Sequence, residues 1–335
     1  MNFPVVGFSE RIAVALTLFL ASHPGFSADL AKPSPLGSCP NLELKETLAD
    51  CPWSSIARAA AKKTTESELS ELLLHHAPSV IADLKNLKET PEILQLWGSS
   101  INYDEFAKGT IVQPELLDLI LKQAGAAPRT DRIVHAGLEH TYGYLFSTLA
   151  TPYGYKRARW VQPDIETGLA LAPGTLSPSP SAGTFLGNVT AFAAQIALAD
   201  HPELSRILGS ASVHPALKKL PASVLNRTRL TEIFAVSPNR SIELRTDFVT
   251  FSRRTEGSTQ ASVLIYSVRE IQDGTPLNPV LITLFPVAHD FMSKALNPEN
   301  LGEGKPIITR YNAYISGASG SATPWTGSRK VTQLP

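Results

Sequence analysis

The feature of this sequence that most constrains its fold is the separation of helical and strand patterns along the chain. After about residue 230, β-branched and aromatic residues gather in runs separated by turn-forming residues, a pattern typical of β-strands. We predict four strands, over residues 241–253, 262–271, 279–287 and 306–315. The connections between the first three are short enough for hairpins, so these strands should be antiparallel neighbours.

Helix signals dominate the chain before these strands. Thr65 and Glu68 form a capping-box pattern ahead of an apolar stripe, and Pro78 is expected to end that helix. Pro91 and Pro114 each stand where the first turn of a further helix would begin. Helices first and strands later predict an α+β fold, with an N-terminal helical region followed by a mostly antiparallel sheet, rather than an alternating α/β fold.

The expected domain organisation follows the same division. We predict a helical subdomain over residues 29–130 and an α+β domain over residues 131–335. Residues 163–184 are rich in Pro, Gly and Ser and are predicted to form a long loop, and the apolar GLALA stretch within it favours packing over a site. The mostly apolar stretch 185–199 that follows predicts a helix buried on several sides.

The N-terminus has the pattern of a signal peptide over residues 1–28. An apolar run at 12–21 follows Arg11 and precedes small residues. As a helix this run would span only ~15 Å, about half of a bilayer core, so we expect cleavage and export to the periplasm or the medium rather than stable membrane insertion. Cys39 and Cys51, the only cysteines, would then meet an oxidising compartment, and we predict that they form a disulfide.

The charge balance and the missing motifs exclude several function classes. Thirty basic and thirty acidic side chains cancel, so no long-range field attracts nucleic acid, and we expect no nucleic-acid partner. The chain has no G-x-S-x-G, G-x-x-x-x-G-K-[ST] or G-x-G-x-x-G pattern. The common serine hydrolases, nucleotide enzymes and nicotinamide enzymes are therefore disfavoured.

The candidate catalytic residues are His135, Glu139 and His140, which lie close together in the sequence. The two histidines are five residues apart, about 140° around a helix, so they do not match the H-E-x-x-H zinc pattern. His135 and Glu139 are four apart, so on a helix they would be neighbours that share a proton or supply two ligands to a divalent metal completed elsewhere. On a strand they would lie ~13 Å apart, and this hypothesis would fail. The alternative is ordinary hydrogen-bonded histidines at the edge of a core.

Two glycines in the same segment bear on whether it is helical. Gly137 and Gly143 would each weaken a helix by roughly 1 kcal/mol relative to alanine. That cost predicts a close approach by another segment or by a ligand, unless the segment is not a helix.

A candidate binding region follows the histidines. Tyr144 and Tyr155 precede the cations Arg157 and Arg159. Guanidinium groups bind carboxylates in bidentate fashion and stack on aromatic rings, so this combination suits an anionic or aromatic small molecule. The alternative is a surface strand whose aromatic rings stack on their own neighbouring arginines.

One face of the predicted sheet is also polar. Arg245 and Asp247 alternate onto the same face of the strand predicted over 241–253. Such a face is usually solvated, and it becomes a pocket wall only if the helices or the long loop cover it.

These residues lead to three hypotheses about function. The first is an exported enzyme, a hydrolase or a lyase, that acts on a small anionic molecule by acid–base or metal-assisted chemistry. His135 would be the base, Glu139 would orient it or join it at a metal, and His140 would contact the substrate. The substrate would be held by Tyr144, Tyr155, Arg157 and Arg159. The alternatives are a non-catalytic exported small-molecule-binding protein and a structural envelope or secreted protein.

Overall fold

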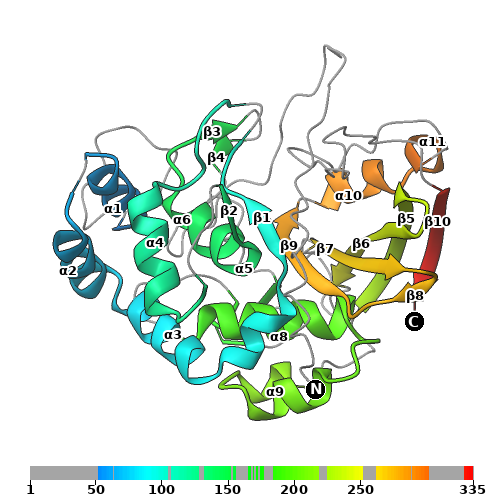
Figure 1. Cartoon of the computed structure of the whole chain (residues 1–335), viewed down its shortest axis with the longest axis horizontal. Coiled ribbons are helices and arrows are strands. Elements are labelled where there is room, and N and C mark those ends of the chain that lie inside the picture. The colour runs from blue at the N-terminus through cyan, green and yellow to red at the C-terminus, as the bar shows by residue number, and fades with distance from the viewer. Residues whose placement is uncertain are drawn as a thin grey trace, which may run out of the picture.

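The protein has an α+β fold in which a layer of helices lies against an antiparallel sheet (Figure 1). The computed structural model describes residues 52–62, 64–104, 107–127, 132–151, 154–155, 165–166, 169, 171–172, 174–176, 184–218, 225–251, 262–287, 289–301 and 328–334. The predicted signal peptide, disulfide and strand over 306–315 lie outside these residues. Within them, no helix is long and apolar enough to cross a bilayer. The predicted order of helices before the sheet is confirmed.

Helix α2 (Glu66–His76) begins at the predicted capping box and α4 (Pro114–Gln123) at the predicted proline, whereas α3 (Pro78–Glu89) begins at Pro78, which was predicted only to end the helix before it. At α2 the Thr65 side chain accepts from the Glu68 amide and the Glu68 carboxylate accepts from the Thr65 amide, which confirms the capping box. Proline stands in the first turn of both α3 and α4, and Gly125 follows α4 with a φ of 67°, a conformation that favours glycine. The segment after Thr90 is a 3-10 helix rather than an α-helix. The elements are α1 (Pro52–Ala60), α2 (Glu66–His76), α3 (Pro78–Glu89), η1 (Pro91–Leu96) and α4 (Pro114–Gln123).

The centre of the molecule is a short pair of antiparallel strands, distant in sequence, followed by an irregular helix. Strand β1 (Ser99–Ile101) pairs antiparallel with β2 (Ile133–His135). The chain then runs without a break through α5 (Ala136–Leu138), the π-helical segment η2 (Glu139–Gly143) and α6 (Tyr144–Phe146). A further pair joins β3 (Ala150–Thr151) to β4 (Gly154–Tyr155).

The sheet has the strand order β10-β5-β6-β7-β8, with β9 also paired to β7, and every pairing is antiparallel. The first three predicted strands are confirmed as β6, β7 and β9, and β7 lies between the other two. Strands β5 and β10 were not predicted, because both are rich in polar and charged residues. The strands are β5 (Leu225–Ser237), β6 (Arg240–Phe251), β7 (Ser262–Gln272), β8 (Thr275–Pro276), β9 (Val280–Val287) and β10 (Ser328–Leu334).

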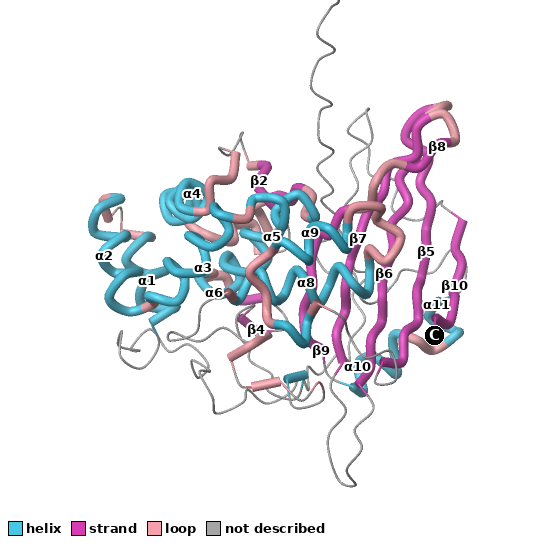
Figure 2. Tube along the Cα trace, turned by 90° about the horizontal axis from the view of Figure 1, so that it is seen from below, coloured by secondary structure: helices cyan, strands magenta, loops and turns pink. Residues whose placement is uncertain are grey.

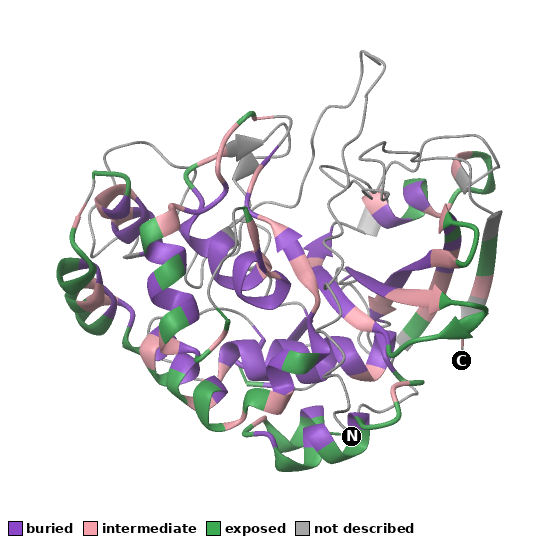
Figure 3. Cartoon of the chain, in the orientation of Figure 1, coloured by how far each residue is buried: buried purple, intermediate pink, exposed green. Residues whose placement is uncertain are grey.

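Helix α8 (Phe185–Ala197) lies between the helical layer and one face of the sheet, here called the inner face (Figure 2). Every residue of α8 except Gln195 is buried, as predicted for this stretch (Figure 3). One apolar cluster extends from Trp53 of α1 through α8 to Leu284 of β9, so the core continues across the boundary predicted near residue 130. Helix α9 (Leu204–Ser210) and the 3-10 helix η4 (Pro215–Leu217) follow α8.

The opposite face of the sheet, here called the outer face, carries a second apolar cluster. Leu244, Leu264 and Val268 belong to it. Met292 and Ala295 of α10 (His289–Ala295) pack on this cluster, and α11 (Pro298–Leu301) follows. The sheet is therefore apolar on both faces, which is why its central strands read as nearly continuous apolar runs.

The described parts of the predicted long loop pack onto the main core. Ile165, Leu171 and Leu176 belong to the same apolar cluster as α8. The buried carboxylate of Glu166 accepts hydrogen bonds from the amides of Gly174, at 3.1 Å, and Leu176, at 2.5 Å. A single acidic side chain thus holds the turn that follows it.

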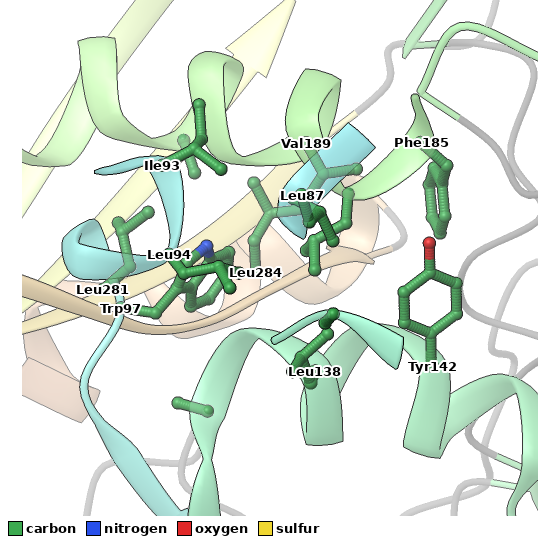
Figure 4. Packing of buried hydrophobic residues seen from close by; sticks show 14 of the residues in the cluster. Leu87, Ile93, Leu94, Trp97, Leu138, Tyr142, Phe185, Val189, Leu281 and Leu284 are labelled. Carbon is green, nitrogen blue, oxygen red and sulfur yellow. The ribbon is translucent and has the colours of Figure 1, made fainter. Parts of the chain in front are cut away.

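Trp97 and Gly98 join the helical layer to the sheet. The Gly98 amide donates to the Leu281 carbonyl of β9 at 2.8 Å, and the Gly98 carbonyl accepts from the Ala136 amide at 2.9 Å. The buried Trp97 ring lies among apolar side chains from several elements (Figure 4) and donates from Nε1 to Thr190 of α8 at 2.8 Å. The irregular helix therefore starts from a fixed position relative to β9.

Gly137 stands where the irregular helix meets this ring. A Cβ atom at Gly137 would lie 2.7 Å from a Trp97 ring carbon, closer than van der Waals contact allows. A Cβ atom at Gly143 would meet Val112 at 3.4 Å, an ordinary contact. The predicted close approach is confirmed at Gly137, where the neighbour is a protein side chain, whereas Gly143 has room for a methyl group.

We expect Gly137→Ala to lower the free energy of unfolding by about 1–2 kcal/mol, because overpacking costs ~1–3 kcal/mol and the better helix propensity of alanine offsets at most ~1 kcal/mol. The matched control Gly143→Ala should leave stability unchanged or raise it. Urea unfolding of both variants checks this prediction. Equal destabilisation by the two substitutions would contradict the steric explanation.

Candidate functional site

His135 caps the irregular helix. It ends β2 and is the N-cap of α5, and its Nδ1 accepts from the Leu138 amide at 3.4 Å. Its Nε2 lies 2.9 Å from the Leu94 carbonyl oxygen. A carbonyl can only accept, so Nε2 carries the proton and Nδ1 carries the lone pair. Both ring nitrogens thus bond the backbone, in agreement with the alternative of a hydrogen-bonded histidine.

Glu139 and His140 form a carboxylate–imidazole pair at the start of the π-helical segment. The Oε2 atom of Glu139 lies 2.8 Å from Nδ1 of His140. The Glu139 side chain is fully buried, whereas that of His140 is 14% exposed. The same Nδ1 lies 3.0 Å from the Ala136 carbonyl oxygen. With two acceptors beside it, Nδ1 carries the proton, and the lone pair of the neutral ring lies on Nε2.

Ser100 completes this group from a distant part of the chain. Its hydroxyl donates to Glu139 Oε2 at 2.9 Å across a sequence separation of 39 residues, and the side chain is buried. The β1–β2 ladder positions it, since Ser100 pairs with Val134. Sequence reasoning missed Ser100 because nothing in its local sequence marks it as polar core.

His135 and Glu139 do not lie on one regular helix, and their side chains meet different groups. His135 lies on β2 and its ring meets Leu94, whereas the Glu139 carboxylate meets Ser100 and His140. His135 ends a strand, whereas Glu139 begins the π-helical segment Glu139–Gly143, and such segments frequently occur at functional sites. The polar pair to consider for proton transfer is therefore Glu139 with His140.

The predicted binding residues fall largely outside the described part of the chain. Tyr144 is the first residue of α6 and Tyr155 the last of β4, but their side chains are not among those described. Arg157 and Arg159 lie outside the described residues altogether. Their role in binding stays a prediction.

A metal at His135 and Glu139 also stays a prediction. Within the described residues, no group of three or more His, Cys, Asp or Glu side chains could hold a metal ion. Any such site would need ligands from other parts of the chain.

Tyr142 connects the π-helical segment to two other helices through a buried carboxylate. Its hydroxyl donates to Oδ2 of Asp83 on α3, and the Leu186 amide in the first turn of α8 donates to the same oxygen at 2.6 Å. The Tyr142 ring also meets Phe185 edge to face, with ring centres 6.3 Å apart (Figure 4). Burial raises the pKa of Asp83 to about 6, and the hydrogen bonds from Leu186 and Tyr142 only partly oppose this effect. These contacts hold the end of the segment in place.

Arg245 and Asp247 share the inner face of the sheet, as predicted, but this face is not simply solvated. Both side chains are buried. Asp247 receives two hydrogen bonds from Arg229, each 2.9 Å long, and Arg245 donates to Asp200 and to Glu243. The helical layer therefore covers a polar part of the sheet as well as an apolar part.

Comparisons of the chain with protein-family models, with curated proteins and with solved structures give no match. The assignment of a function therefore depends on the geometry of the chain itself.

We expect the buried Asp83 carboxyl to make stability depend on pH. Its pKa rises from 3.8 to about 6 on folding, so its contribution to stability is fully present below pH ~4 and is lost as the pH rises through about 6. The loss amounts to at most ~3 kcal/mol. In Asp83→Asn this share of the pH dependence should disappear.

Urea unfolding of the wild type and Asp83→Asn at several pH values between about 4 and 7 measures this effect. Glu71→Gln, at an exposed position on α2, is the matched control and should follow the wild-type curve. Parallel pH curves for the wild type and Asp83→Asn would show that Asp83 does not carry the effect.

Proposed function

We propose that the protein is an exported enzyme, a hydrolase or a lyase, in which His140 exchanges a proton with a small anionic substrate. The observation that supports this proposal is the contact of 2.8 Å between the buried Glu139 carboxylate and Nδ1 of His140. A buried carboxylate that orients a partly exposed imidazole is the arrangement by which many enzymes hold a histidine base. His140 replaces His135 as the proposed base.

Each residue of the group has a separate role in this proposal. Nε2 of His140 accepts a proton from the substrate, or from a water molecule, and later returns it. The imidazolium that forms is stabilised by the Glu139 carboxylate, which acts strongly because it is shielded from water. Ser100 donates to the same carboxylate oxygen and fixes its direction. His135 caps the helix that carries the pair.

Two parts of the proposal, export and an anionic substrate, are supported by the sequence alone. The apolar run at 12–21 supports export, and Arg157 and Arg159 support recognition of a negative charge. Neither inference depends on the contact between Glu139 and His140, so each is open to a separate test.

The test is a screen of the purified mature protein for hydrolysis and elimination, followed by kinetics of variants on any substrate that is turned over. We expect His140→Gln to lower kcat/KM by about 10²–10⁴-fold, the usual contribution of a general base. Glu139→Gln should lower kcat as well, because it removes the charge that stabilises the imidazolium. His75→Gln, at an exposed position on α2, should have no effect.

The nitrogen-15 NMR shifts of His140 give a readout that does not need a substrate. The neutral ring should carry its proton on Nδ1 in the wild type, and Glu139→Gln should weaken this preference. Unchanged turnover in His140→Gln, or an Nε2 proton in the wild type, would each contradict the assignment of His140 as the base.

A further inference from the structure

The inner face of the sheet carries partly exposed basic side chains towards the edge formed by β5 and β10. Alternation places Arg227, Arg229 and Thr231 of β5 on this face, and all three are partly exposed. The intervening residue Leu230 faces the outer cluster and is fully buried. A row of polar side chains thus lies at the margin of the region that α8 covers.

Most charges on this face are matched by a partner of opposite sign. Arg229 donates from Nε and Nη2 to the two carboxylate oxygens of Asp247, at 2.9 Å each, and from Nη2 to the carbonyls of Ile196 and Ala197 at the end of α8. Arg269 donates to Asp200 and to Glu243. The bonds between charged side chains hold each pair in place. The bonds from Arg229 to the two carbonyls satisfy acceptors in the last turn of α8.

Arg227 is the exception among the charged residues of this face that the structure describes. Its Nε atom is buried and has no hydrogen-bond partner. Its charge is attracted by Asp247 and repelled by Arg229, and burial lowers its pKa. Asp247 already receives two hydrogen bonds from Arg229. Two guanidinium groups therefore lie near one carboxylate, and one positive charge remains.

The surroundings of Arg227 indicate the kind of molecule that would match it. Its cross-strand neighbours are Val249 on β6 and Leu334 on β10, both apolar. A carboxylate has one negative charge and two oxygens in the geometry that a guanidinium fork binds. A phosphate dianion would exceed the single charge to be matched. Val249 is fully buried, so an apolar group attached to the carboxylate would lie against the partly exposed Leu334.

We propose that Arg227, which is partly exposed, binds a small monocarboxylate with an apolar body at the margin of the inner sheet face. A buried guanidinium Nε without a hydrogen-bond partner lowers stability, whereas methionine covers similar surface without that cost. Side chains that lower stability in this way, with no compensating contact within the fold, are typical of functional sites. This site goes beyond the proposed acid–base function and does not depend on His140.

The test uses butyrate as the probe and follows the Nε–H signal of Arg227 by nitrogen-15 NMR at constant ionic strength, with chloride as the balancing anion. We expect a saturable shift of this signal. Arg227→Gln and Arg227→Met lack this signal, so butyrate binding to them is followed by the backbone amide signals of Val249 and Leu334, and it should be weakened at least tenfold in each. Arg240→Gln is the matched control, because Arg240 lies on the same sheet and is bonded to Glu270, so its loss should leave binding unchanged.

Stability measurements separate binding from a structural role of Arg227. We expect Arg227→Met to fold with an unchanged or higher Tm, since it removes a partly buried charge. The absence of a saturable shift in the wild type would overturn the proposal, and a lower Tm of Arg227→Met would then assign Arg227 a structural role. Inorganic phosphate that binds more tightly than butyrate would overturn the choice of a monocarboxylate. Butyrate binding that persists in His140→Gln would show that this site is independent of the proposed base.

Discussion

Helix α8 has to be enclosed by other elements, because it is apolar on nearly every side. The helical layer covers it from one side and the inner face of the sheet from the other, which creates one continuous core. The Trp97–Gly98 connection depends on this arrangement, since Trp97 bonds Thr190 of α8 and Gly98 bonds β9. The irregular helix with Glu139 and His140 begins at that connection. The packing of the helical layer and the sheet around α8 therefore positions the candidate site.

Polar groups inside this core are held by bonds that join separate elements. Asp83 joins α3 to α8 and to Tyr142. Asn188 of α8 donates to the Thr175 carbonyl at 3.0 Å and accepts from the His214 amide at 2.8 Å. Each such bond compensates for the loss of water around a buried group. Together these bonds fix how the elements are oriented against one another. Hydrogen bonds are directional, whereas apolar contacts alone would specify this orientation less well.

The candidate site was partly predictable from the sequence. The density of titratable residues identified the segment that contains Glu139 and His140. The cost of glycine in a helix predicted the close approach of another segment at Gly137. The role of His135 was not predictable, because the contact of its ring with the Leu94 carbonyl depends on η1 lying beside β2. Ser100 was missed for a similar reason. A serine in a short strand has no local signature of the carboxylate that it bonds.

The sequence by itself determined the α+β class, the capping box of α2, the proline start of α4 and the central strands, because these signals act over a few neighbouring residues. Only the tertiary structure decided which polar groups meet. Asp83 and Leu186 are 103 residues apart, and Ser100 and Glu139 are 39 apart. Contacts at such separations depend on how whole elements pack, and no periodicity or local motif records that packing.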